Sequence, residues 1–391
     1  MIKISFYAIF ACILTMCILF MTTLQEQFFE LIRAGLWGTP ANPVLFDGQT
    51  DWKEIYRSAR VQALLGVVFD GVQSLPKEKL PPRALYLQWC NVVLQMEENN
   101  RLLNRELGRV YALLRKESIE PVLMKGQGLA QNYRYPLHRQ CGDIDLFTGL
   151  RDYDRANELL RIEASSEEEE LYKHASFTWH GIVVENHRIL TQLSAPGPNR
   201  RLQREIERWH GSADCRKRMI EAVEVTLPPL PFDTVFVLLH AIQHFLDEGI
   251  GLRQICDWAC MLYAQRDMPG REETAALLKA LGLEKAARVF GAIVVCYLGL
   301  PAEHLPVPFQ EADIKTAEWL LSDIWAGGNF GKHNAAQPKR PRGYWRGKWH
   351  TFVRVSKRCR EWGAIVPQEA RWHPLALALH AVSMQWKKRV R

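Results

Sequence analysis

The chain has 391 residues, of which 48% are hydrophobic and 24% are charged. These fractions are typical of globular proteins and exclude a largely disordered chain, a collagen-like chain and a multi-span membrane protein. The net charge is +7, but residues 332–391 hold 15 Lys and Arg against Glu361 and Glu369 alone, which is +13. This basic tail suggests a phosphate-rich partner, either RNA or an anionic membrane surface, and a solvated basic face is the alternative.

The nine cysteines form no C-x-x-C pair, and no His/Cys group has the spacing of a zinc site. We interpret them as reduced thiols and predict no disulfide partner. A reducing compartment indicates a cytoplasmic protein.

The N-terminal residues 1–24 include an uncharged, strongly apolar stretch from Ile4 to Leu24. Its length just reaches that of a membrane-spanning helix. Three interpretations stay open: a membrane anchor, a secretion signal, or a start codon assigned upstream of a true start at Met21. The residues from Thr23 onward have the pattern of an amphipathic helix, and we expect the apolar stretch to lie outside the catalytic core.

The pattern that follows predicts an α+β fold. Helical spacing covers residues 25–36, 51–73 and 82–117, which form an N-terminal helical region at 25–117. Short strand-like segments then define a core at 118–197: a strand after Glu120, a strand at 141–147, and a hairpin of 175–179 with 182–187. A helix at 153–162 and a solvated run of glutamates at 165–170 lie between them. From 198 onward the pattern is helical, with a helical domain at 198–325 and a basic helical tail at 326–391.

Two aspartates stand two residues apart in the strand predicted at 141–147. Because side chains alternate along a strand, Asp143 and Asp145 project from one face, and the apolar residues beside them face the core. Neighbouring like charges repel unless something compensates, and carboxylate oxygens suit Mg²⁺. The pair indicates a candidate metal site, with two solvated acids as the alternative. On this view Asp145→Asn leaves the metal-free protein as stable as before or more so.

The predicted hairpin supplies a third acid on a neighbouring strand. Val183, Glu185 and His187 share one face by the same alternation. Two carboxylates can hold a metal ion while a third takes a proton from an attacking hydroxyl. The alternatives are a surface Glu185 paired with Arg188 and a half-buried, hydrogen-bonded His187.

A glycine turn precedes these strands. Lys125-Gly126-Gln127-Gly128 joins a strand to a short helix, where backbone N–H groups and the helix dipole can approach a phosphate and the lysine adds a full charge. A plain strand-to-helix turn with a solvated lysine is the alternative. Together with the acidic strands, the turn is a layout for a nucleoside triphosphate (NTP) with Mg²⁺.

This layout resembles the DNA polymerase β-like nucleotidyltransferase superfamily, and most closely its family of uncharacterised nucleotidyltransferases. Members of that family look like L-K-G-x-x-L, Y-P, R-x-x-x-D-I-D-L and E-x-H. The matching segments here are Met124–Leu129, Tyr135-Pro136, Arg139–Leu146 and Glu185–His187, and a downstream helical stretch holds His240, His244 and Leu252–Asp257. The resemblance covers about residues 24–300.

The resemblance implies a small mixed nucleotidyltransferase sheet flanked by N-terminal helices and a helical C-terminal half. It implies Asp143 and Asp145 as metal ligands for Mg²⁺ or Mn²⁺, with Glu185 completing the catalytic set. The residues implied in holding the NTP are Lys125, Gly126, Gly128, Arg139 and His187. Gln127 departs from the usual Ser or Gly, so that a hydroxyl contact to phosphate is missing.

The leading hypothesis is a Mg²⁺-dependent nucleotidyltransferase that moves NMP from an NTP to an unknown hydroxyl or phosphate acceptor. An RNA-modifying or toxin-like nucleotidyltransferase is an alternative, because aromatic residues among basic ones can stack bases. Those aromatic residues are Trp345, Trp349, Trp362, Trp372 and Trp386, for which we favour positions in a helix core. A DxD glycosyltransferase is disfavoured by the long helices before the motif, and a non-catalytic membrane-anchored scaffold by the intact acidic set.

One further pair stands four residues apart on a predicted helix. Arg253 and Asp257 are interpreted as a surface ion pair, and an arginine facing the substrate cleft is the alternative.

Overall fold

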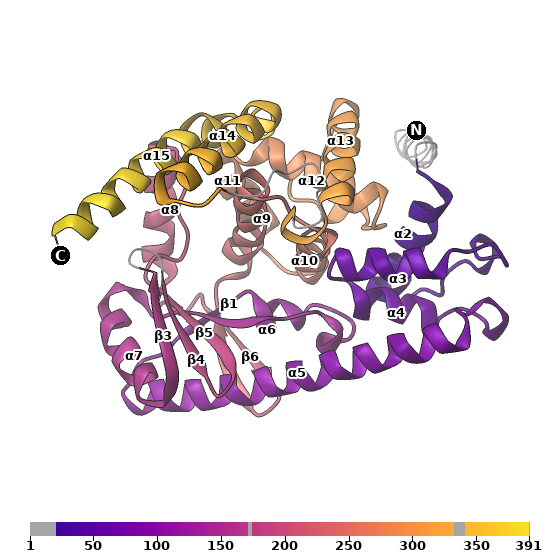
Figure 1. Cartoon of the computed structure of the whole chain (residues 1–391), viewed down its shortest axis with the longest axis horizontal. Helices are drawn as coiled ribbons and strands as arrows, with labels where there is room; N and C mark the ends of the chain where they lie inside the picture. Colours follow the sequence, from indigo (N-terminus) through magenta and orange to yellow (C-terminus); the bar gives the residue numbers. More distant parts are fainter. Residues whose placement is uncertain (1–20, 171–173, 332–340, 391) are drawn as a thin grey trace.

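The computed structural model describes residues 21–170, 174–331 and 341–390, and it confirms an α+β fold in which helices flank one mixed sheet (Figure 1). Most of the apolar N-terminal stretch, residues 1–20, lies outside the described residues. Among the described helices, none combines the length and apolar character needed to span a bilayer.

The N-terminal helical region begins at a well-capped helix. Helix α2 (Thr23–Trp37) starts after Thr22, whose side chain accepts from the backbone N–H of Gln25 while the Gln25 side chain accepts from the backbone of Thr22. The helix predicted at 51–73 is instead two helices, α3 (Trp52–Val61) and α4 (Leu65–Gln73). Ala63, between them, has φ 55°, a left-handed conformation that ends the first helix.

The remaining N-terminal elements lead to the sheet. Helix α5 (Arg83–Lys116) confirms the long predicted helix and runs beneath the sheet in Figure 1. Short 3₁₀ turns connect the helices at Pro43–Leu45 and Lys77–Lys79.

Within the described residues the sheet has seven strands in the order β3-β4-β5-β2-β1-β7-β6. Strand β2 lies at its centre, antiparallel to β1 and parallel to β5. The hairpin predicted around His180-Gly181 is confirmed as β4 paired with β5. The first five strands are β1 (Val122–Met124), β2 (Asp143–Phe147), β3 (Ala164–Glu170), β4 (His174–Trp179) and β5 (Ile182–His187). The segments between them form α6 (Gly126–Ala130), a 3₁₀ turn (Pro136–His138) and α7 (Gly149–Glu163).

Two parts of the sheet differ from the expectation. The segment after 198 was expected to be helical, but after α8 (Pro196–Trp209) the chain forms β6 (Arg216–Ile220) and β7 (Val223–Leu227), and β7 pairs in parallel with β1. These five-residue strands are too short for their alternation to outweigh the surrounding helical pattern. The glutamate run is part of β3, an edge strand, where charged residues discourage pairing with other chains.

The two faces of the sheet differ in what covers them. Helices α5 and α7 cover one face, where Leu107 and Tyr111 pack among the strand residues Ile144, Leu146 and Val184, all fully buried. The opposite face, which carries the aspartates, faces the helical half of the chain (Figure 1). The alternation along β2 therefore divides the strand into a core face and a face that carries the two aspartates, as predicted.

The helical half forms a second apolar core around residues such as Leu238, Ile255, Trp258 and Phe290. Its elements are α9 (Leu230–Asp247), α10 (Leu252–Ala264), α11 (Arg271–Ala280), α12 (Glu284–Cys296), α13 (Glu311–Gly327), and 3₁₀ turns at Ala302–His304 and Asn329–Gly331. Helix α9 supplies a wall of the site described below.

The basic tail folds into two helices, α14 (Tyr344–Trp362) and α15 (Pro367–Val390), which pack on the helical half. Buried Arg358 donates to Asp323 at 3.0 Å and to the Phe245 carbonyl at 2.8 Å. Of the tail tryptophans, Trp362 is buried, but Trp345, Trp349 and Trp372 are 53%, 67% and 40% exposed. Their assignment to a helix core is therefore wrong, because helical spacing alone does not show which stripe faces inward; the Trp386 side chain lies outside the described residues.

Candidate active site

The centre of the site is set by the pairing of two parallel strands. Asp145 on β2 is in register with Glu185 on β5, and His187 follows two residues later on the same face. One ligand atom from each of these three residues lies within 4.8 Å of the others. His187 Nε2 is 2.8 Å from Asp145 Oδ1 and 3.6 Å from Glu185 Oε2. Two carboxylates and an imidazole at this spacing fit a divalent cation.

Asp145 is the most buried acid of this group, with 4% of its surface exposed. Its Oδ1 lies 3.3 Å from Lys125 Nζ, and His187 approaches the same oxygen. Burial alone raises the pKa of Asp145, but the Lys125 charge and the His187 hydrogen bond outweigh burial and hold this pKa below its ordinary value. Asp145 is therefore ionised and already paired with positive or hydrogen-donating groups.

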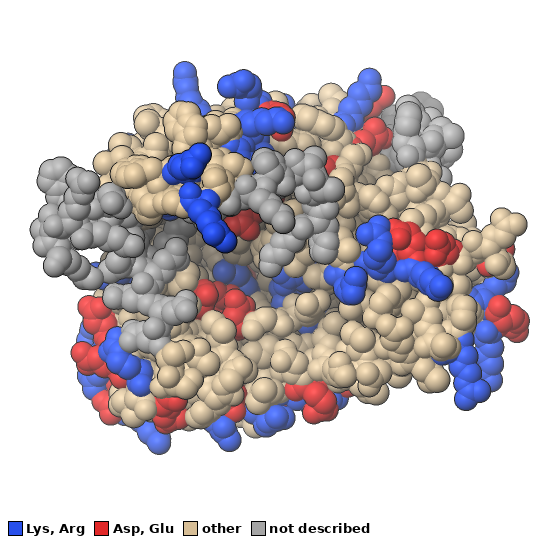
Figure 2. Space-filling view, in the orientation of Figure 1, with Lys and Arg blue, Asp and Glu red and all other residues tan. Residues whose placement is uncertain are grey.

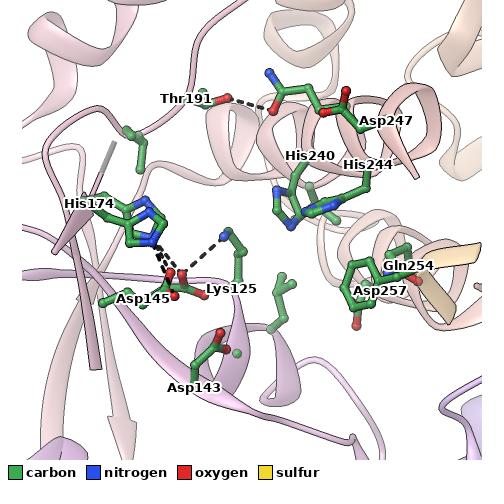
Figure 3. Close-up of a pocket in the computed structure, with 18 of the residues that line it drawn as sticks. Lys125, Asp143, Asp145, His174, Thr191, His240, His244, Asp247, Gln254 and Asp257 are labelled. Carbon is green, nitrogen blue, oxygen red and sulfur yellow. Dashed lines mark hydrogen bonds and ion pairs between the residues drawn. The ribbon is translucent and has the colours of Figure 1, made fainter. Parts of the chain in front are cut away.

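Asp143 stands one alternation earlier on β2 and lines the same cavity, but it is not among the three closely grouped residues. The negative charge of Asp145, followed by burial, raises the pKa of Asp143 to about 6. Figure 3 shows its carboxylate apart from the contacts that link Asp145 and Lys125. The two aspartates share a face as predicted, yet their environments differ.

The glycine turn brings a cation to the acids. Lys125 has φ 51° and Gly126 has φ 35°, left-handed values that favour glycine at the second position. A Cβ at Gly126 would lie 3.3 Å from the Asp143 carbonyl oxygen. Gln127, the departure from the family pattern, is buried and its Nε2 donates to that same carbonyl at 3.4 Å. The Gln127 amide thus fastens the turn to β2.

Gly128 and Arg139, also expected to hold the NTP, have other surroundings than Lys125 and Gly126. Gly128 packs against Leu227, whose Cδ2 would be 2.9 Å from an added Cβ. Arg139 lines the cavity but is buried, and its Nε and Nη2 donate to the two Asp257 oxygens at 2.7 and 2.9 Å. Tyr133 donates to the same carboxylate at 2.7 Å.

Arg253 does not form the surface ion pair expected with Asp257, whose oxygens are held by Arg139 and Tyr133. Arg253 instead lines the cavity, and its Nη1 donates to the Gln140 carbonyl at 3.2 Å. Its buried Nε has no hydrogen-bond partner among the described residues. The Asp257 carboxylate is buried, so it pairs with the groups that reach it in three dimensions and not with the arginine four residues away.

The three acids, His187, the Lys125-Gly126 segment and Arg253 line one cavity of about 430 Å³. Figure 2 shows a hollow between the sheet and the helices above it, with charged side chains of both signs at its edge. Across from Asp145, helix α9 contributes His240 and His244, whose rings meet edge to face at 4.4 Å (Figure 3). Burial, followed by the nearby Lys125 charge, lowers the pKa of His240 well below its ordinary value, so this ring is neutral.

Helix α15 of the tail forms another wall of this cavity. The sequence pattern did not predict this contribution. His373 of α15 lies 3.0 Å from Ser194 Oγ through Nδ1 and 2.7 Å from Asp247 Oδ1 through Nε2. The buried Glu369 carboxylate accepts from the backbone N–H of Ser194 at 2.8 Å and of Ala195 at 3.2 Å. These partners are more than 120 residues apart in sequence, so no local spacing could have joined them.

Comparison with known proteins identifies the family of the chain. A family described as uncharacterised nucleotidyltransferase matches residues 48–299, more than half of the chain. The chain belongs to this family. No curated protein and no solved structure matches the chain significantly. The tail helices, including Glu369 and His373, lie beyond the matched segment.

Proposed function

We propose that this chain is a Mg²⁺-dependent nucleotidyltransferase that moves NMP from an NTP to a hydroxyl or phosphate acceptor. The observation that carries the proposal is the convergence of Asp145, Glu185 and the Lys125 turn in one cavity. Nucleotidyl transfer needs little covalent chemistry from the protein beyond positioning and charge neutralisation, and this cavity offers groups for both.

The acidic side of the cavity would hold the cation. Asp145 and Glu185 are the central donors, and Asp143 extends the set along β2. His187 orients Asp145 through its 2.8 Å hydrogen bond, and Ser176 Oγ donates to Glu185 at 3.2 Å. A divalent ion bound there would neutralise charge on the triphosphate. Mg²⁺ or Mn²⁺ suits this oxygen-rich set.

The basic side would hold the triphosphate. The Lys125 ammonium and the backbone at Gly126 line the cavity beside the acids, and Arg253 lines it with a guanidinium nitrogen that lacks a described partner. Arg139 supports this side indirectly, because its ion pair with Asp257 holds the segment before β2 against α10.

An RNA acceptor is a second candidate, favoured by the exposed tryptophans of the tail. Trp345 and Trp349 are one helical turn apart on α14, among Arg346 and Lys348, and aromatic rings with cations can stack bases. A lower affinity of Trp349→Ala for single-stranded RNA, measured by fluorescence anisotropy, is the expected result. Binding to anionic vesicles but not to RNA would instead indicate a membrane surface.

The proposal is tested by label transfer. The purified protein is incubated with each α-labelled NTP and Mg²⁺, with and without cell extract, and label is followed into RNA, protein and small molecules. We expect transfer from at least one NTP, abolished in Asp145→Asn and kept in Asp154→Asn, which removes an exposed acid on α7. Equal transfer by wild type and Asp145→Asn would refute the proposed site.

A further inference from the structure

The cavity contains a second constellation with chemical capacity, on the wall away from the acids. Ser194 follows β5, Asp247 ends α9, and His373 reaches in from α15. Ser194 Oγ lies 3.0 Å from His373 Nδ1, and His373 Nε2 lies 2.7 Å from Asp247 Oδ1. All three residues line the same cavity as Lys125 and Asp145.

The order of these groups suits proton removal from the serine. A carboxylate can only accept a hydrogen bond, so Asp247 places the His373 proton on Nε2. With a single proton on the ring, Nδ1 accepts from the Ser194 hydroxyl at 3.0 Å, and Glu369 Oε1 lies 4.0 Å from the same nitrogen. Nucleophile, base and orienting acid within hydrogen-bond reach are the arrangement of an activated serine, recognised by geometry and not by chain order.

The serine is held in place independently of its hydroxyl. Both oxygens of buried Glu369 accept from the Ser194 backbone N–H, at 2.8 and 2.9 Å, and one of them accepts from Ala195 at 3.2 Å. These backbone donors are therefore not free to stabilise the oxyanion of an acyl-transfer reaction. The cationic Lys125 in the same cavity suits a phosphoryl group instead.

We propose that Ser194 is a covalent nucleotidyl acceptor, activated by His373 and Asp247; this rests on the proposed function of the acidic site. Ser194 Oγ attacks the α-phosphorus of the NTP, and a new O–P bond forms. The bond from the α-phosphorus to the bridging oxygen breaks, and pyrophosphate leaves with its electron pair. The Ser194 proton passes to His373 Nδ1, and Asp247 stabilises the imidazolium. The product is a Ser194–NMP phosphodiester.

The competing explanation is a structural clamp, in which His373 only fastens α15 to α9 and to the loop after β5. The two explanations differ in the role of Ser194 Oγ, which is a hydrogen-bond partner in the clamp and the nucleophile in the acceptor. Ser194→Ala removes the hydroxyl but leaves the Glu369 contacts to the backbone, so a clamp loses one hydrogen bond while an acceptor loses its function. Thr191→Val is the matched control, because Thr191 lines the same cavity and its hydroxyl bonds Gln243 at 3.3 Å instead of a histidine.

The test uses the full chain with α-labelled NTP and Mg²⁺, and measures pyrophosphate release and protein-bound label, with peptide mass spectrometry to locate the modified residue. We expect one NMP on Ser194, none in Ser194→Ala, and wild-type labelling in Thr191→Val. His373→Ala and Asp247→Asn should slow labelling, the former by about 10² to 10⁴-fold, as expected for loss of a general base. Thermal melts of each variant establish that it is folded.

The outcomes separate the covalent-acceptor proposal from the nucleotidyltransferase proposal. Pyrophosphate release without label on Ser194, or label that persists in Ser194→Ala, overturns the covalent acceptor and leaves the nucleotidyltransferase proposal standing. Neither pyrophosphate release nor label overturns both. If His373→Ala is unfolded, Asp247→Asn replaces it, and unchanged labelling in that variant removes the activation argument.

Discussion

His187 Nε2 lies 2.8 Å from Asp145 Oδ1, although the two residues belong to different strands and are 42 positions apart. The parallel pairing of β2 with β5 creates this contact, because Asp145 is in register with Glu185 and His187 follows on the same face. The acidic site is thus a consequence of strand register. A shift of β5 by one residue would move Glu185 and His187 to the opposite face of the sheet, away from Asp145.

The two aspartates should respond in opposite ways to neutralisation in the metal-free protein. Asp145→Asn leaves Lys125 and His187 without the carboxylate that they contact, so we expect a loss on the order of 2 kcal/mol in the free energy of unfolding. Asp143→Asn removes a charge that Asp145 disfavours, so stability should stay equal or rise. Urea unfolding with a chelator present measures both.

This prediction reverses the sequence-based expectation for Asp145→Asn. The alternation along 141–147 correctly shows that both acids share a face, but it cannot show which one meets a lysine. Equal destabilisation by both substitutions would mean that Asp143 and Asp145 have equally favourable interactions in the folded protein.

A change in pH should affect the junction of α5 with the β6–β7 hairpin through Glu120. Burial raises the pKa of Glu120, but hydrogen bonds from Arg115, Thr226 and Lys217 outweigh it and lower this pKa from 4.5 to about 2. Since the folded pKa lies below the unfolded one, the stabilisation is present above pH 4.5 and is lost as the pH falls through 2.

The measurement is the difference in unfolding free energy between wild type and Glu120→Gln across this pH range. We expect the variant to be less stable at neutral pH, by less than about 1 kcal/mol because the carboxylate is partly exposed, and the difference to vanish toward pH 2. If the difference in unfolding free energy between wild type and Glu120→Gln grows on acidification, the pKa of Glu120 is not lowered by folding.

Substitution at the glycine turn should weaken nucleotide binding. Gly126→Ala places a Cβ 3.3 Å from the Asp143 carbonyl oxygen at φ 35°, and the turn must shift to relieve this contact. Strain of about 1 kcal/mol and at least a several-fold higher Kd for NTP are expected, measured by calorimetry. Gly48→Ala is the control, since a Cβ there has nothing within 4 Å. An unchanged Kd in Gly126→Ala would show that the glycine turn does not contribute to NTP binding.

The fold was predictable wherever one local pattern decided it. The α5 periodicity, the β4–β5 hairpin and the alternation around Asp143 each lie within a single segment. The β6–β7 pair was missed because its strands are short and their partner, β1, lies about 100 residues earlier. The wall formed by Ser194, Asp247 and His373 depends on contacts between distant segments, which spacing alone does not encode.

The first described helix leads to a prediction about the N-terminus. Helix α2 begins at Thr23 with its own cap, and Met21 and Leu24 are partly buried against the core. A chain beginning at Met21 should fold and bind NTP as tightly as the full chain, by thermal melt and calorimetry. Loss of folding on this truncation would place residues 1–20 in the core.

Pyrophosphate release tests most directly whether the acids of β2 and β5 form the proposed metal-dependent NTP site. Initial rates are measured for wild type, Asp145→Asn and Asp154→Asn, with Mg²⁺ and with a chelator. We predict release only with the metal, a fall of at least about 10²-fold in Asp145→Asn, and wild-type rates in Asp154→Asn. Metal-independent release, or an undiminished rate in Asp145→Asn, would contradict the account.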